Sequence, residues 1–207
     1  TVAFLNVGGI ANISLISPEQ VTGFDTGPGN TLSDAWIRKH QQQAFDTSGA
    51  WASTGNVNEP LLQCMLADPY FRRPAPKSTG QDYFNLAWLE NLEISRIAPV
   101  DVQRTLVELT ALSASEAIKD SGCERVYLFG GGRHNDLLTE RLRSLIAPVE
   151  LTNTITLGID AGFMEATAFA WLAKQCIDRN AGNMPAVTGA RSERVLGTIY
   201  PQTSQGR

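Results

Sequence analysis

The sequence of 207 residues contains one aspartate that is well placed for acid–base chemistry, Asp25. A short apolar run, residues 21–24, precedes it, and the turn-forming sequence Thr-Gly-Pro-Gly follows it. We therefore expect its carboxylate at the end of a strand, fixed at the rim of a sheet and partly removed from water, which suits a general base. The alternative is an aspartate that only hydrogen-bonds the backbone of its own turn.

A second carboxylate, Glu165, lies in the apolar stretch 163–172. A helix that is apolar on all sides is expected to be buried. A buried carboxylate is costly unless it has a partner or faces a wet cavity. Glu165 is therefore a candidate for contact with water or a polar substrate, and the alternative is a structural ion pair.

Other charged residues have weaker signals. Lys77 belongs to a basic and polar stretch, residues 72–80, which either binds an acidic substrate group or forms a solvated loop. Asp34 has a simpler interpretation, as a polar residue in the first turns of a helix, where the helix dipole favours an acid. Asp160 is expected to cap a helix. His134, next to the triple glycine, either contacts a nucleotide or has an incidental position there.

The pair Gly8 and Gly9 separates two apolar runs, residues 2–7 and 10–16, which predicts a β-hairpin. Asn6 and Asn12 flank the turn on either side. Because glycine has no Cβ, the backbone N–H groups of such a turn can approach an anion closely, for example a phosphate group. A hairpin turn that binds nothing is the alternative.

Three consecutive glycines, Gly130, Gly131 and Gly132, follow the apolar run 125–129 and precede Asn135, near which a helix is expected to begin. Ligands of open α/β sheets bind at this end of a strand. Three residues without side chains leave room for a planar ring or a phosphate group against the backbone. The alternative is a tight turn between strand and helix.

Several classes of protein are disfavoured. No G-x-x-x-x-G-K-[ST] motif is present, which excludes a P-loop, and Gly27-Pro28-Gly29 lacks the third glycine of a dinucleotide fingerprint. The net charge of −4 argues against a nucleic acid or an anionic membrane as partner. The sequence contains no apolar run of about 18 residues, so a transmembrane helix is not expected. The three cysteines and two histidines show no metal-ligand spacing, so no metal ligands are assigned. Three scattered cysteines also suit a reducing compartment.

The elements that position these groups follow from the apolar pattern. Three strands and a helix are expected up to residue 40, and an alternation of helices and strands begins at residue 99. Residues 41–98 are rich in Gly and Pro and are expected to form an irregular insertion with short helices. This order predicts an α/β fold with a mixed β-sheet flanked by helices. We expect one domain, residues 1–40 and 99–207, interrupted by the insertion.

Taken in this order, the segments resemble the anhydro-N-acetylmuramic acid kinase family, and the likeness covers nearly the whole chain. The matching segments include Phe4-Leu-Asn-Val-Gly-Gly-Ile-Ala-Asn-Ile-Ser14, Gly23-Phe-Asp-Thr-Gly-Pro-Gly-Asn30, Asp34-Ala-Trp36, Pro74-Ala-Pro-Lys-Ser-Thr-Gly80, residues 130–135 and Met164-Glu-Ala166. The resemblance implies one half of an actin-like, ribonuclease H-like ATPase fold. It also implies a cytoplasmic homodimer that uses ATP and Mg²⁺ in cell-wall recycling.

The same resemblance implies a reaction and roles for the candidate residues. ATP phosphorylates the 6-oxygen of the amino sugar while water opens the anhydro bridge, which gives N-acetylmuramate 6-phosphate. Asp25 is then the base that activates water, and Glu165 and Lys77 contact the sugar or its water. The residues implied to bind ATP and its phosphates are Asn6, Gly8, Gly9, Asn12, Thr26, Gly27, Gly29, Gly130, Gly131, Gly132 and Asn135.

The first domain of the family has no counterpart in this sequence. We therefore expect that the chain is part of a longer protein, and that a missing N-terminal half is needed for a complete cleft. Two alternatives stay open. One is a nucleotide-binding fragment without turnover of its own, and the other is a kinase of the same superfold that acts on a different sugar.

Overall fold

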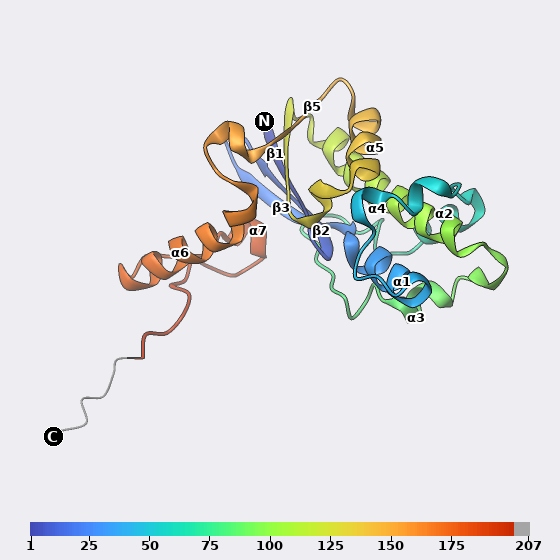
Figure 1. Ribbon diagram of the computed structural model, residues 1–207. Helices are drawn as coiled ribbons and strands as arrows, with labels where there is room; N and C mark the ends of the chain where they lie inside the picture. Colours follow the sequence, from blue (N-terminus) through green and yellow to red (C-terminus); the bar gives the residue numbers. More distant parts are fainter. Residues whose placement is uncertain (201–207) are drawn as a thin grey trace.

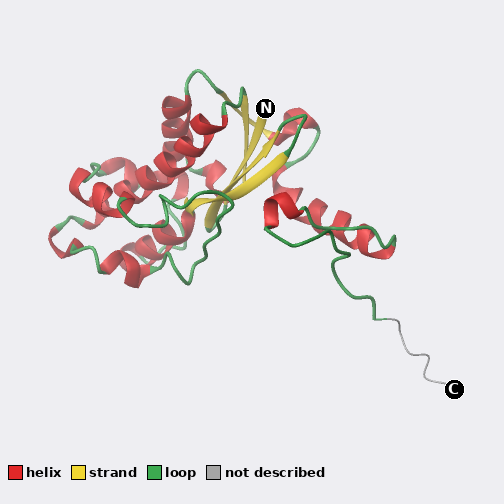
Figure 2. Cartoon of the chain, turned by 180° about the vertical axis from the view of Figure 1, so that it is seen from behind, coloured by secondary structure: helices red, strands yellow, loops and turns green. Residues whose placement is uncertain are grey.

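The computed structural model describes residues 1–200 and centres on a five-stranded mixed sheet (Figures 1 and 2). The strands are β1 (Val2–Val7), β2 (Ile10–Ile16), β3 (Val21–Pro28), β4 (Arg125–Phe129) and β5 (Glu150–Asn153), in the order β3-β2-β1-β4-β5. The first three strands are antiparallel neighbours, whereas β4 and β5 continue the sheet in parallel from β1. The predicted mixed sheet and the predicted hairpin around the Gly-Gly pair are therefore confirmed.

Helices follow the strands in the predicted order. They are α1 (Asn30–Gln41), α2 (Glu59–Leu66), α3 (Leu86–Glu90), α4 (Pro99–Ser121), α5 (Asp136–Ile146), α6 (Met164–Ile177) and α7 (Pro185–Thr188). Short 3-10 helices are η1 (Thr47–Gly49), η2 (Ala52–Thr54), η3 (Ile94–Arg96), η4 (Gly131–His134), η5 (Thr154–Leu157) and η6 (Ala161–Phe163). The last strand, β5, is short because η5 begins directly after it at Thr154.

Local sequence explains where several helices begin and end. The side chains of Asn58 and Asn135 accept backbone N–H groups in the first turns of α2 and α5, as N-cap residues do. Pro99 opens α4, where its missing N–H is harmless, and Gly122 ends it in a left-handed conformation with φ of 61°.

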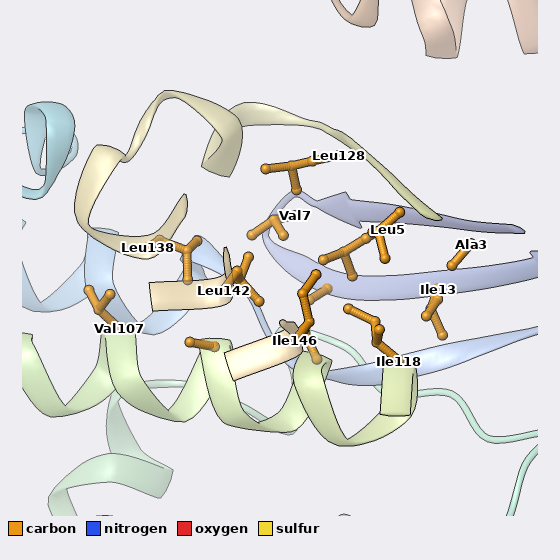
Figure 3. Close-up of a cluster of buried hydrophobic side chains, with 14 of the residues drawn as sticks. Ala3, Leu5, Val7, Ile13, Val107, Ile118, Leu128, Leu138, Leu142 and Ile146 are labelled. Atoms are coloured by element: carbon orange, nitrogen blue, oxygen red, sulfur yellow. The ribbon is translucent and has the colours of Figure 1, made fainter. Parts of the chain in front are cut away.

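One face of the sheet carries the main hydrophobic core (Figure 3). Ala3, Leu5 and Val7 of β1 are fully buried there against α4 and α5. Because side chains alternate along a strand, the residues between them point to the opposite face. On that opposite face Phe4 stacks on Tyr127, with ring centroids 5.0 Å apart.

Residues 41–98 build much of a second core with α1 and the first half of α4. Its fully buried members include Leu32, Met65, Tyr70, Phe84 and Leu109. The insertion therefore does not stand apart from the fold but holds α1 in place. The division into domains stays a prediction, and its last residues, 201–207, lie outside the described part of the chain.

Helix α6 contradicts the expectation of a buried helix. None of its residues is buried, and Phe169 and Trp171 expose 72% and 51% of their surface. Both views show α6 projecting away from the sheet and its helices (Figures 1 and 2). The apolar pattern indicates that this helix has a surface to cover, but the pattern alone does not place a covering element beside it.

Within residues 1–200, the structure has no helix with the length and apolar character needed to cross a membrane.

Candidate active site

Three polar side chains form a row across neighbouring strands of the sheet. The strand register places Asn6 opposite Asn12, and Asn12 opposite Asp25. Because Val7, Ala11 and Ile13 point into the core, the alternation along the strands puts this polar row on the opposite face. The structure thus brings together three candidates that are well separated in the sequence.

Asp25 is held by residues of the insertion. One carboxylate oxygen, Oδ2, accepts the backbone N–H of Thr79 at 2.9 Å. The backbone N–H of Asp25 donates to the carbonyl of Lys77 at 3.1 Å, and its carbonyl accepts the hydroxyl of Tyr70 at 2.7 Å. The alternative was an aspartate that hydrogen-bonds the backbone of its own turn. The structure instead shows the Asp25 carboxylate bonded to Thr79. It is positioned by a segment some fifty residues further along the chain, |i−j| = 54 for Thr79.

The half-buried position of Asp25 affects its acidity. Burial raises the pKa of the Asp25 carboxyl, and the hydrogen bond from Thr79 opposes this by lowering the pKa, with a net rise. Its second oxygen, Oδ1, has no hydrogen-bond partner among residues 1–200. A fixed carboxylate with a raised pKa and one free oxygen can accept a proton from a bound molecule.

The hairpin turn lies against the start of α1. The carbonyls of Gly8 and Gly9 accept the N–H groups of Asn30 and Gly29 at 2.8 and 2.9 Å. A Cβ on Gly29 would lie 2.3 Å from the Gly8 carbonyl oxygen, so only glycine allows this approach. The N–H groups of Gly8 and Gly9 themselves have no partner among residues 1–200, which leaves them available to an anion.

The triple glycine divides into two packing residues and one open residue. A Cβ on Gly130 would lie 2.3 Å from Asn6 Oδ1, and one on Gly132 would lie 2.4 Å from the Val7 side chain. These two glycines let η4 pack tightly on β1, which supports the tight-turn alternative for them. At Gly131 the nearest atom to an added Cβ, Asn30 Nδ2, is 3.5 Å away.

A cavity of about 550 Å³ opens beside Gly131. Its other walls come from the start of α1, including Asn30 and Asp34, and from residues 45–48. Asn135 also lines it, although its side chain already caps α5 through the N–H of Leu138 at 3.1 Å. Ligand pockets of about 300–1,000 Å³ are typical of drug-sized and cofactor-sized molecules.

Asp34 is a polar residue of this cavity that sequence reasoning assigned only to the helix dipole. Burial raises the pKa of its carboxyl to about 6, while Arg38 lowers the pKa and Asp46 raises it. Its carboxylate accepts no hydrogen bond within residues 1–200. The four-residue spacing from Asn30 was the available signal, since it places both side chains on one side of a helix.

Comparison with known proteins decides between families of similar architecture. The sequence model of anhydro-N-acetylmuramic acid kinase matches residues 1–202. The chain belongs to this kinase family. The family resemblance predicted from the sequence is thereby confirmed.

The chain is also similar to a solved structure described as the activator of the 2-hydroxyisocaproyl-CoA dehydratase from Clostridium difficile with bound ADPNP. The identity is 14% and the TM-score is 0.48. The match covers 74% of this chain and 53% of the activator, so the chain spans about half of that protein's length.

In this member of the anhydro-N-acetylmuramic acid kinase family, the side chains of Lys77 and Thr26 lie away from the polar row and outside the cavity beside Gly131. Lys77 Nζ donates to the carbonyl of Phe71 at 3.1 Å and lies 4.9 Å from the centre of the Tyr70 ring. It lines a separate cavity of about 460 Å³. Thr26 lines the same cavity, and its buried hydroxyl donates to the carbonyl of Ala11 at 3.3 Å. A Cβ added at Gly27 would lie 2.8 Å from the Phe71 ring, so this glycine has a packing role as well.

Glu165 is exposed in the first turn of α6 rather than buried. It lines neither of the two cavities described above. Glu165 was a candidate because it was expected to be buried in an apolar helix, and that expectation is wrong in the described part of the chain. Its role stays a prediction from family resemblance.

No group of three or more His, Cys, Asp or Glu side chains within residues 1–200 could hold a metal ion. Magnesium is commonly bound by one or two carboxylates together with phosphate oxygens and water. Most ligands of such an ion would therefore come from phosphate and water rather than from this chain.

Proposed function

We propose that the chain carries the catalytic aspartate and the nucleotide-binding part of a kinase for anhydro-N-acetylmuramic acid. The observation that supports this best is Asp25, a half-buried carboxylate fixed by Thr79 on the same face as Asn6 and Asn12. Membership of the family supports the proposed substrate and reaction type.

In the proposed reaction Asp25 accepts a proton from water as the water oxygen bonds to the anomeric carbon. The bond between that carbon and the 6-oxygen breaks, and the 6-oxygen attacks the γ-phosphorus of ATP. The bond from phosphorus to ADP breaks, which gives N-acetylmuramate 6-phosphate and ADP. Magnesium bound with the phosphates would supply neutralisation of their charge.

The remaining residues position the reactants. The free N–H groups of Gly8 and Gly9 are suited to stabilise the phosphates, because oriented backbone donors bind anions without reorganising. The cavity beside Gly131 and Asn30 has the size needed for the nucleoside. Since phosphoryl transfer depends mainly on positioning and electrostatics, such groups are sufficient contributors.

The test is replacement of Asp25 by asparagine, followed by measurement of ADP release with the anhydro sugar. A general base contributes about 10²–10⁴-fold, so Asp25→Asn is expected to lower turnover by at least about a hundredfold. Nucleotide affinity should be retained, because Asp25 lies outside the cavity beside Gly131. Asp82→Asn, at an exposed carboxylate, is the matched control and should keep its activity. Full activity of Asp25→Asn would refute the assignment.

A second candidate function, nucleotide binding without turnover, is favoured by the exposed position of Glu165 on α6. It is separated from the first by assaying the chain alone and with a separately produced first domain of the family. ADP release in either mixture supports the kinase. Nucleotide binding with no release in both mixtures supports the binding fragment. The oligomeric state, a cytoplasmic location and a role in cell-wall recycling are proposals that follow only from family membership.

A further inference from the structure

Asp34 lacks a partner although it is half-buried in the wall of the cavity beside Gly131. Its helix, α1, is firmly placed, because Leu32 and Trp36 are buried on the other side and the Trp36 indole donates to the Pro99 carbonyl at 2.8 Å. No protein group within residues 1–200 pairs with this carboxylate, and its oxygens are open to the cavity. Burying such a group without hydrogen bonds is unfavourable, so a ligand that supplies donors is expected.

Two other charged groups of this cavity are already engaged by the protein. The Asp46 carboxylate accepts the N–H groups of Trp51 and Ala52, both at 2.9 Å. The Arg133 guanidinium donates to the Gly130 carbonyl at 2.9 Å. Asp34 makes no salt bridge within residues 1–200. The Asp136 carboxylate also has no partner within residues 1–200, but it is exposed, so Asp34 is the half-buried open acceptor of this site.

We propose that Asp34 accepts hydrogen bonds from the ribose hydroxyls of a nucleotide bound in this cavity. The inference rests on the proposed function, since it assumes that the cavity takes the nucleoside part of ATP. An ionised carboxylate only accepts hydrogen bonds, and a vicinal diol offers two donors on adjacent carbons. An acidic residue that binds a ribose hydroxyl is a common solution in nucleotide sites.

The direction of the nucleotide follows from the charges. Asp34 repels phosphates, whereas the N–H groups of Gly8 and Gly9 attract them. Asn30 connects the two places, because it lines the cavity and its N–H donates to the Gly8 carbonyl at 2.8 Å. The base then lies near Gly131, the ribose at Asp34 and the phosphates toward the hairpin turn.

The proposal includes a pH dependence. The charged or titratable groups around Asp34 are Arg38 on its own helix, Asp46 on the adjoining loop, and Arg133, His134 and Asp136 across the cavity. Burial raises the pKa of the Asp34 carboxyl to about 6. Below that pH the group is neutral and accepts ribose hydroxyls less strongly, so the contribution of the ribose to affinity should decline.

The experiment compares ATP with 2′,3′-dideoxy-ATP by calorimetric titration of the chain in the presence of magnesium. Hydrogen bonds to a charged group are worth enough to predict a preference for ATP of about tenfold to a hundredfold. Asp34→Ala and Asp34→Asn should bind the two nucleotides almost equally, with the affinity for dideoxy-ATP kept. Lowering the pH from 7.5 to 5.5 should reduce the preference of the wild type, and the phosphates of both nucleotides titrate alike.

Asp136→Ala is the matched control, because it removes one negative charge from the same cavity. It should change the affinities for ATP and dideoxy-ATP by the same factor and leave the preference intact. Thermal unfolding of every variant shows whether the fold is kept, and Asp34→Asn preserves the shape of the side chain.

The outcomes are distinguishable. A wild type that binds ATP without preferring it to dideoxy-ATP overturns the role of Asp34 and leaves the proposed kinase function standing. The same holds if Asp34→Ala and Asp34→Asn weaken both nucleotides equally. A wild type that binds neither nucleotide overturns the nucleotide site itself and Asp34's role with it.

Discussion

Replacing Gly130 by alanine probes the contact that joins the triple glycine to the polar row. Gly130 has φ of 83° and ψ of 177°, a conformation that essentially only glycine adopts. Forcing another residue into such a region costs about 1–3 kcal/mol. The new Cβ would also lie 2.3 Å from Asn6 Oδ1 and 2.7 Å from the Val7 carbonyl oxygen. Shifting β1 to relieve such overpacking costs about 1–3 kcal/mol more.

The free energy of unfolding of Gly130→Ala should therefore fall by about 4 kcal/mol, the centre of the two ranges combined. In a chain of this size each kcal/mol lowers Tm by about 2–4 °C, so a drop of about 8–16 °C is expected. Urea denaturation and thermal unfolding by circular dichroism measure both quantities.

Two neighbouring glycines provide the controls. Gly122 also has a positive φ, 61°, but an added Cβ there meets nothing within 4 Å, so Gly122→Ala should cost only about 1–2 kcal/mol. Gly131→Ala should change stability by less than about 0.5 kcal/mol, because its Cβ would contact only Asn30 Nδ2 at 3.5 Å. If Gly130→Ala is no less stable than Gly122→Ala, the close contact of Gly130 with Asn6 is refuted.

Two further predictions concern charged side chains. Burial raises the pKa of Asp34 from its ordinary 3.8 to about 6, so the folded state binds more protons and the free energy of unfolding should fall as pH rises through this window. Urea midpoints should show a weaker fall in Asp34→Asn, and an unchanged pH profile would contradict the shift. Glu108→Ala leaves Arg104 and Arg141 without their buried partner and should cost about 3 kcal/mol, whereas Glu90→Ala, in an exposed pair, should cost about 0–1 kcal/mol. Equal losses in urea denaturation would contradict this difference.

The parts of the fold that follow from neighbouring residues were predictable. The Gly8-Gly9 hairpin depends on two glycines between apolar runs, and the first turn of α5 depends on the cap Asn135. Both are short-range features, which a sequence shows directly. The mixed sheet followed from the order of such elements.

The parts that depend on distant contacts were not predictable. The hydrogen bond from Thr79 to Asp25 joins the insertion to β3, and no residue next to Asp25 in the sequence indicates that it forms. Asp34 became a candidate only once folding placed it across a cavity from Gly131. The prediction that Glu165 is buried was wrong. The apolar sequence of α6 indicates a helix whose surface would be covered by another element, but it does not show that such an element packs against it.

The position of β1 in the middle of the sheet has a consequence for the order of folding. Its pairing with β2 is local, but on its other side Val2 pairs with Arg125, after the insertion and the whole of α4. Long-range pairing of this kind is slow, because the intervening chain must be ordered first. During synthesis the three-stranded meander can form early, with one flank of β1 waiting unpaired. A chain whose synthesis stops before β4 would keep the edge of β1 unpaired, and an unpaired strand edge is prone to aggregate.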